Sequence, residues 1–272
     1  MNRAPATAKV NLALVVGPRR DDGRHEVATV LQRVDLADRI AVEPARKLSV
    51  KGFAEDTLVR RALEELAAAA GAEPHWAARI WKAIPVAAGL GGGSSDAATA
   101  LRLASETLPE PISAEALHEL AAALGADVPF FLTAGPQLGE GTGTDLKALD
   151  LPQDYWIVLL LPNDASKEST ASVYEAFDER GGEQSYSERR ARLDETLAAV
   201  RRASDLAALP PNDLASSPLA EELRSLGAFR ADVSGAGPTV YGLFQHRRTA
   251  AAAERALRRA GRTWLTVPTW YG

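Results

Sequence analysis

The amino-acid sequence predicts an α+β protein with two domains, and three observations lead to this prediction. The chain has 272 residues, which is more than a single ordinary domain needs. Its beginning is rich in strand patterns, and helical patterns follow them. Its second part reads as a strand, helices, two strands, a helix and a strand, an order typical of an antiparallel sheet backed by helices.

The boundary between the predicted domains lies near Pro152. There the polar segment DLPQD is followed by the apolar run YWIVLLL at 155–161, which is typical of a new buried strand. We therefore expect a first domain at 1–152 and a second domain at 153–272.

The elements of the first domain begin with alternating apolar residues over 9–16, the pattern of a half-buried strand, so Lys9 and Asn11 share one face. The turn DLAD is expected to separate the next two strands. Further expected elements are strands at 25–33, 39–42 and 80–84 and helices at 57–70, 97–101 and 113–125. In the second domain we expect helices at 170–177, 186–203, 219–226 and 249–260, and strands at 155–161, at 263–267 and on both sides of 234–238.

The composition limits the class of protein. A formal net charge of -5 argues against a broad surface for nucleic acid. The absence of cysteine excludes disulfides and thiolate metal sites. The first thirty residues lack the pattern of a signal peptide, and no window holds the roughly 18 to 20 apolar residues that span a bilayer. We expect a cytoplasmic protein that binds neither nucleic acid nor membrane.

The clearest functional pattern is the stretch PVAAGLGGGSSDAATAL at 85–101. Its glycines permit positive φ, which lets several N–H groups point toward one anion. Ser94, Ser95 and Asp96 are expected to cap the helix that follows, and the positive end of its dipole would face the same anion. The stretch is neither a Walker A sequence nor GxGxxG, and a plain flexible turn is the alternative. We predict that it binds phosphate.

Asp127 stands directly behind the helix expected at 113–125, in the segment ADVPFF. Because Pro129 cannot continue a helix and favours extended backbone at Val128, Asp127 is expected in a turn before an apolar strand. Functional side chains often collect at such turns, although a lone aspartate there can also be a simple turn residue. The next segment, QLGEGTGT at 137–144, is expected to be a second glycine-rich loop.

The stretch at 85–101 resembles the phosphate loop of the GHMP kinases. Further segments resemble that family in the same order: AKVNLALVV at 8–16, DGRHEVATVLQRVDLAD at 22–38, LGADVPFFL at 124–132, PNDLA at 211–215 and SGAGPTVYGLF at 234–244. The resemblance implies the two-domain GHMP kinase fold, with a ribosomal-protein-S5-domain-2-like first domain and a ferredoxin-like second domain. It also implies a kinase that uses ATP and Mg²⁺.

Among these kinases, the chain most resembles those that phosphorylate the C2 hydroxyl of 4-diphosphocytidyl-2-C-methyl-D-erythritol in the non-mevalonate isoprenoid pathway. Without the resemblance, Lys9 would be read as a solvated surface lysine. The resemblance implies that Lys9 and Asp127 form a catalytic pair. Asp127 would accept the proton of the acceptor hydroxyl, and Lys9 would keep the carboxylate ionised.

The resemblance also implies which residues contact ATP and its metal. The residues implied to hold the ATP phosphates are Pro85, Ala87, Ala88, Gly89, Leu90, Gly91, Gly92, Gly93, Ser94 and Ser95. A serine hydroxyl at the end of the loop is a sensible ligand for Mg²⁺, and we assign this contact to Ser95. Ser94 is the other candidate, and helix capping is the alternative role of both serines.

The residues implied to bind the acceptor are Asn11, Arg24, His25, Tyr174, Gly235 and Gly237. Arg24 departs from the family pattern, in which a tyrosine stacks on the cytosine; a guanidinium can also stack on a ring or reach the diphosphate. Tyr174 has helix packing as its alternative role, and Gly235 and Gly237 have that of a tight turn.

Three alternatives to this function remain open. The first is another small-alcohol kinase of the family, such as a homoserine or mevalonate kinase. The second is a decarboxylase of the same fold, and the third is a non-catalytic nucleic-acid-binding module. Under the favoured reading the partner is a small-molecule derivative of cytidine diphosphate, and the chain is a monomer or a homodimer.

Overall fold

A computed structural model describes residues 2–56, 58–165 and 169–269. Thr57, at which we predicted the first helix to begin, lies outside the described residues. The strands are β1 Asn2–Arg19, β2 His25–Pro44, β3 Ser49–Lys51, β4 Trp76–Trp81, β5 Gln137–Glu140, β6 Asp145–Ala148, β7 Trp156–Pro162, β8 Arg230–Val233, β9 Val240–Phe244 and β10 Gly261–Thr266. The helices are α1 Leu58–Ala69, α2 Gly92–Ser105, α3 Ala114–Leu124, η1 Pro129–Leu132, α4 Thr170–Glu179, α5 Tyr186–Ala199, η2 Ala203–Ala208, α6 Pro218–Ser225 and α7 Arg247–Leu257.

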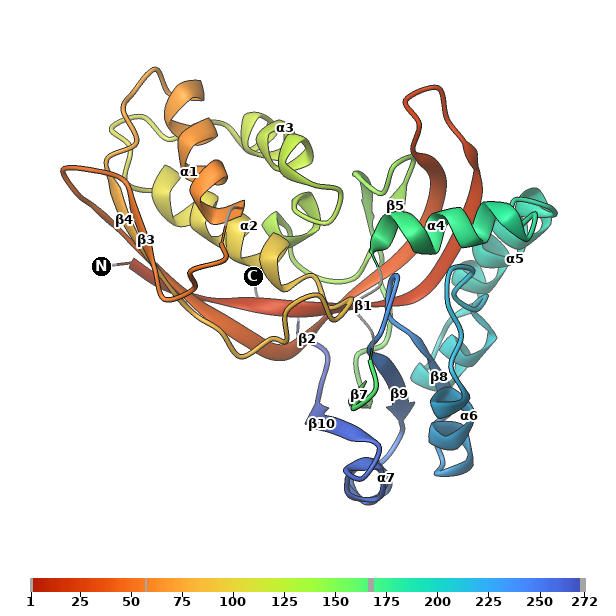
Figure 1. Ribbon diagram of the computed structural model, residues 1–272. Helices are drawn as coiled ribbons and strands as arrows, with labels where there is room; N and C mark the ends of the chain where they lie inside the picture. Colours follow the sequence, from red (N-terminus) through yellow and green to blue (C-terminus); the bar gives the residue numbers. More distant parts are fainter. Residues whose placement is uncertain (1, 57, 166–168, 270–272) are drawn as a thin grey trace.

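The first sheet has the strand order β3-β4-β2-β5-β6, with β1 paired to β2. Helices α1, α2 and α3 lie over one face of it (Figure 1). They bury an apolar cluster that includes Leu63, Leu101 and Phe130 against the sheet. This burial explains why the apolar positions of α1 and α2 recur at helical spacing.

Three predictions about this sheet were wrong. The DLAD segment is no turn, because β2 runs unbroken through it. Thr7 pairs with Ala37 and the next residue of β1, Ala8, pairs with Val34, so a β-bulge absorbs the extra residues. The strand before the phosphate loop is at 76–81 rather than 80–84, and the predicted loop at 137–144 contributes the strand β5, which pairs with β6 as a hairpin.

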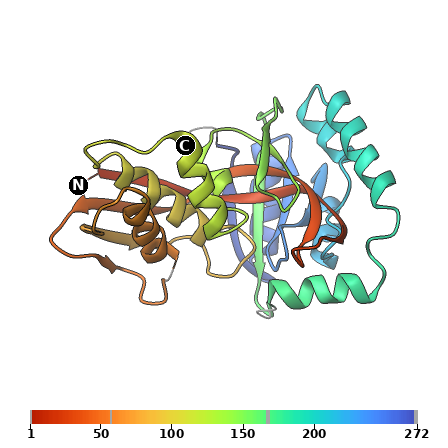
Figure 2. The same ribbon diagram turned by 90° about the horizontal axis from the view of Figure 1, so that it is seen from above.

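The second sheet is antiparallel throughout, as predicted. Its strand order is β10-β7-β9-β8. Figure 2 shows α5 at the end of the molecule opposite the N-terminus. Among the described residues, no helix has both the length and the apolar character needed to cross a membrane.

A hydrophobic cluster connects the two sheets. Val10 and Leu12 of β1 pack in the same buried cluster as Ile157, Leu159 and Tyr241 of the second sheet. The change of sheet occurs between Ala148 and Trp156, around the boundary that we placed at 152. Division into domains 1–152 and 153–272 stays a prediction, because a shared core joins the sheets.

Candidate active site

The predicted phosphate loop leads into α2, but the helix begins earlier than we expected. Gly91 is its N-cap residue with φ 67°, and Gly92 is already helical. The predicted capping by Ser94, Ser95 and Asp96 is therefore wrong: no side chain caps α2, and its first N–H groups are left for another acceptor. Only Gly89 and Gly91 of the four glycines have positive φ. The amino end of α2 retains the features of an anion site.

The loop Ser234–Gly237, between β8 and β9, lies against this phosphate loop. The hydroxyl of Ser234 donates to the carbonyl of Gly89 (2.9 Å), and the amide of Thr239 donates to the carbonyl of Ala88 (3.2 Å). A Cβ on Gly89 would lie 2.4 Å from the carbonyl oxygen of Ser234, so a glycine is required there. The phosphate loop and the Ser234–Gly237 loop are therefore in direct contact, although they are far apart in sequence.

Lys9 and Asp127 are brought together as predicted, with Nζ 3.2 Å from Oδ2. Lys9 is no solvated surface lysine: its side chain is 5% exposed, against 38% for Asp127. Its ammonium also donates to Oδ1 of Asn11 (2.7 Å), whose amide donates to Thr29 on β2 (2.8 Å). A buried ammonium thus faces a carboxylate that opens toward a cavity.

The turn that carries Asp127 differs from our prediction. Val128 has helical backbone (φ −65°, ψ −44°), and Pro129 begins the short helix η1 instead of a strand. Proline fits the first position of a helix, where its missing N–H has no partner to lose. The guanidinium of Arg33 donates to the carbonyl of Phe130 (3.1 Å) and holds η1 in place.

A cavity of about 370 Å³ lies between these elements. The predicted site residues that line it are Lys9, Asn11, Ala87, Gly89, Gly91, Ser94, Asp127, Tyr174, Gly235 and Gly237. Of the two serines, Ser94 lines the cavity, whereas Ser95 is 1% exposed. In the part of the chain that the structure describes, His, Asp and Glu side chains nowhere gather in a group of three that suits a metal ion.

A second cavity, also about 370 Å³, is lined by Arg24, His25 and Tyr174. The ring of His25 stacks on that of Tyr174 with centroids 4.9 Å apart. Burial, followed by the negative charge of Asp127, raises the pKa of Tyr174 to about 12, so its phenol stays neutral. Nε2 of His25 lies 2.7 Å from Oδ1 of Asp178, a partner that no sequence pattern indicated.

A third cavity, about 280 Å³, is lined by the loop residues 85–94 together with Phe53, Leu58 and Lys82. Lys82 pairs with the buried carboxylates of Asp38 and Asp96. Burial raises the pKa of Asp96 to about 7; Lys82 opposes this shift and Asp38 adds to it. The sequence did not predict this triad, because its members come from a strand, a loop and a helix with no regular spacing.

Comparison with known families identifies the fold. A model described as GHMP kinases N terminal domain matches residues 57–135, and one described as GHMP kinases C terminal matches 191–263. A protein of Geobacter metallireducens named 4-diphosphocytidyl-2-C-methyl-D-erythritol kinase is 36% identical over 96% of this chain and 95% of its own length. The chain belongs to the GHMP kinase family. This confirms the predicted family, the α+β fold and the assignment as an ATP-dependent kinase.

Two further GHMP kinases are similar over most or all of their length. A protein of the same name from an Anaeromyxobacter species is 41% identical over 93% of this chain and 85% of its own length. A crystal structure of 4-(cytidine 5'-diphospho)-2C-methyl-D-erythritol kinase matches with a TM-score of 0.79 and 32% identity, and covers 100% of both chains. The likeness of this chain to these kinases therefore includes both sheets and the helix α2.

Proposed function

We propose that this GHMP kinase transfers the γ-phosphate of ATP to the C2 hydroxyl of 4-diphosphocytidyl-2-C-methyl-D-erythritol, a step of the non-mevalonate isoprenoid pathway. The observation that carries the proposal is the place of the Lys9–Asp127 pair. The pair lines the first cavity, which shares the lining residues Gly89, Gly91 and Ser94 with the third cavity along the phosphate loop. The first cavity also shares Tyr174 with the second cavity, which His25 lines.

In the proposed reaction, Asp127 accepts the proton of the acceptor hydroxyl as the oxygen attacks the γ-phosphorus. The new P–O bond forms while the bond to the bridging oxygen breaks, and ADP leaves with that oxygen. Lys9, at 3.2 Å, pairs with the carboxylate and adds positive field near the transferred group. Asn11 fixes the direction of the Lys9 ammonium through its 2.7 Å hydrogen bond.

The phosphates of ATP are proposed to lie at the amino end of α2, on the free N–H groups that follow Gly91. Mg²⁺ neutralises phosphate charge when it is bound. The described residues offer no dense ligand set for Mg²⁺, which suits a cation held mainly by phosphate oxygens and water. The hydroxyl of Ser94 or Ser95 is the protein contact that we propose.

The cytosine is proposed to occupy the cavity lined by His25 and Tyr174. An aromatic face and a histidine edge suit a flat base, and the exposed Arg24 at the same cavity suits a ring face or the diphosphate. Homoserine and mevalonate contain no nucleobase, so this aromatic cavity favours the cytidyl acceptor over them.

The test is a kinase assay with ATP, Mg²⁺ and each acceptor in turn, with ³¹P NMR of the product. We expect turnover with the cytidyl acceptor, and a new phosphate monoester on C2 beside the intact diphosphate. Turnover only with mevalonate or homoserine would reject the proposal in favour of another small-alcohol kinase. Release of carbon dioxide from a phosphorylated acid would indicate the decarboxylase, and RNA binding without any phosphoryl transfer would indicate the non-catalytic module.

A further inference from the structure

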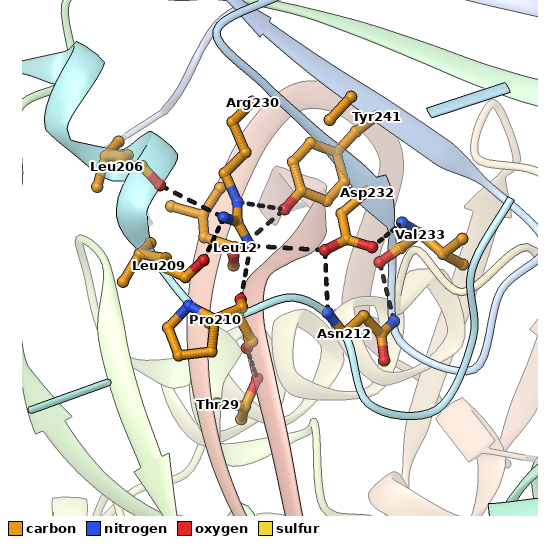
Figure 3. A network of polar contacts seen from close by, with 12 residues as sticks. Leu12, Thr29, Leu206, Leu209, Pro210, Asn212, Arg230, Asp232, Val233 and Tyr241 are labelled. Atoms are coloured by element: carbon orange, nitrogen blue, oxygen red, sulfur yellow. Dashed lines mark hydrogen bonds and ion pairs between the residues drawn. The ribbon is translucent and has the colours of Figure 1, made fainter. Parts of the chain in front are cut away.

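A buried guanidinium lies behind the second glycine loop, outside the cavities described above. Arg230, at the start of β8, is 6% exposed. Its Nη1 donates to the carbonyl of Leu209 (2.7 Å), and its Nη2 donates to that of Pro210 (2.8 Å). Figure 3 shows the guanidinium between these carbonyls, which follow η2, and the side chain of Asp232. Arg230 therefore fixes the backbone just before the PNDLA segment at 211–215.

Asp232 and Asn212 continue this contact to the glycine loop. Oδ2 of Asp232 lies 3.5 Å from Nη2 of Arg230 and accepts from the backbone amide of Asn212 (2.9 Å). The side-chain amide of Asn212 then donates to the carbonyls of Val233 (2.9 Å) and Gly235 (2.6 Å). All three polar side chains are less than a tenth exposed, so water does not compete for these bonds.

Tyr241 connects the same guanidinium to β1. Its hydroxyl accepts a hydrogen bond from Nε of Arg230 (3.2 Å). The same hydroxyl donates to the carbonyl of Leu12 (3.2 Å), the residue after Asn11. Beside it, the amide of Asp213 donates to the carbonyl of Leu14 (2.9 Å). The network therefore holds both the strand of Lys9 and Asn11 and the loop that faces them.

The loop so held touches the reacting groups. A Cβ on Gly235 would lie 3.3 Å from Oδ1 of Asn11 and 3.6 Å from Nζ of Lys9. On its other side, Ser234 donates to the carbonyl of Gly89 in the phosphate loop. A small shift of Gly235 would therefore reach Lys9 and the phosphate loop together.

We propose that Arg230, with Asp232, Asn212 and Tyr241, is a positioning unit that sets the Ser234–Gly237 loop against Lys9, Asn11 and the phosphate loop. This inference rests on the proposed phosphoryl transfer. The four residues would affect that reaction through the position of the loop, without contact to ATP or to the acceptor. A buried ion pair is a poor device for stability alone, since apolar residues of similar volume often replace one without loss. Here its hydrogen bonds end on backbone carbonyls at the edge of the site, which suits a role in geometry.

The test compares two variants of the network with two controls that carry the same kinds of substitution elsewhere in the chain. The double variant Arg230→Met/Asp232→Leu removes both charges together and leaves neither unpaired, and Tyr241→Phe removes only the hydroxyl. The control Arg258→Met/Glu254→Leu removes an ion pair at the carboxyl end of α7, in which Arg258 is exposed. The control Tyr155→Phe removes a buried hydroxyl that lies 3.4 Å from Gln32. Both controls leave the two glycine loops untouched.

We expect kcat to fall by about thirtyfold in the double variant and about threefold in Tyr241→Phe, because small displacements of reacting groups cost large factors in rate. KM for the cytidyl acceptor should stay within about twofold, since the network does not touch His25 or Tyr174, and Tm should stay within a few degrees.

The two control variants should keep the wild-type kcat. Unchanged kcat in both folded network variants would overturn the proposal, as would a drop in Tm with normal kcat per folded molecule. If the double variant does not fold, Asn212→Ala takes its place under the same criteria.

A second readout needs no activity, so it separates this inference from the proposed function. Hydrogen exchange should quicken at the amides of Gly237 and Thr239 in the network variants and stay unchanged in the controls. These amides donate to Ser234 and Ala88 in the wild type. If the wild type fails to phosphorylate the cytidyl acceptor but exchange still quickens, the proposed function fails and the positioning unit stands. Unchanged exchange at these amides would contradict the inference directly.

Discussion

At the scale of single residues, the candidate site depends on the ammonium of Lys9. Burial of an unpaired charge is costly, so an ammonium that is 5% exposed needs partners. Asp127 and Asn11 supply them at 3.2 and 2.7 Å. The same pairing holds the carboxylate of Asp127 at the edge of the cavity, where the proposed reaction needs it.

Asp127→Asn tests the carboxylate. The amide has the same shape but cannot take the proton of the acceptor hydroxyl, so kcat should fall by about a hundredfold or more. The fold should be retained, with a lower Tm, because the buried ammonium of Lys9 loses its counter-charge but keeps the hydrogen bond to Asn11. Steady-state kinetics with thermal unfolding of the same samples checks both points, and near-wild-type kcat would remove Asp127 from the proposed mechanism.

Asp96→Asn tests the buried triad of Lys82, Asp38 and Asp96. The pKa of Asp96 rises from 3.8 to about 7 on folding, so between these values the folded state binds more protons than the unfolded state. Its contribution to stability is present below pH 4 and is lost as pH rises through about 7. Urea unfolding from pH 5 to 8 should show the free energy of unfolding of the wild type falling relative to that of the variant.

Asp145→Asn serves as a control for this pH dependence, because Asp145 is an exposed carboxylate on β6. Its curve should run parallel to that of the wild type. A wild-type curve parallel to that of Asp96→Asn as well would show that Asp96 does not titrate in this range.

At the scale of elements, the phosphate loop takes its form from its neighbours as much as from its glycines. Gly89 has φ 76° and would carry a Cβ only 2.4 Å from Ser234 and 2.7 Å from Gly237. Both contacts come from the loop between β8 and β9. The amino end of α2 is thus shaped by a segment some 145 residues away in the chain.

Gly89→Ala should therefore disrupt the loop, with a fall in kcat/KM for ATP of about a hundredfold or more, because backbone rather than a flexible side chain would have to move. Gly71→Ala is the matched control. It has a similar φ of 62° with nothing within 4 Å of the added Cβ, so it should cost about 1 kcal/mol of backbone strain and no activity. Equal loss of activity in both variants would mean that the clash is unimportant.

At the scale of the whole molecule, the two sheets depend on a shared core. Val10 and Leu12 of β1 are fully buried, in one cluster with Ile157, Leu159 and Tyr241. Removing the second sheet would expose these side chains of β1 to water, at roughly 1.5 to 3 kcal/mol for each large one. The predicted domains are therefore not expected to be independent.

A fragment of residues 1–152 tests this dependence. We expect it to lack cooperative unfolding and fixed near-UV circular dichroism, and to bind a hydrophobic dye. Mixing with residues 153–272 should restore cooperativity, since the cluster can reform between the fragments. A fragment that unfolds cooperatively by itself would show that 1–152 is a self-sufficient domain.

Much of the fold was predictable because it depends on local pattern. The helices of both halves and the antiparallel second sheet followed from spacing and caps such as Ser113, which accepts from the amide of Ala116 (3.2 Å). The predictions were wrong where tertiary contacts, such as strand pairing, overrode the local preference of the sequence for a turn or a strand. β2 continues through DLAD because its partner β1 is long enough to pair on both sides of a bulge. Pro129 begins η1 because the loop behind α3 is anchored by Arg33.

The sequence by itself determined the family, the fold class and the glycine-rich lead into α2, because these depend on residue type and spacing along the chain. Only the tertiary structure decided which residues meet. It set Asp178 beside His25, closed Ser234 onto Gly89 and linked Arg230 through Asn212 to Gly235. Such contacts join residues up to about 150 positions apart, and they arise from strand pairing and core packing, which no local pattern records.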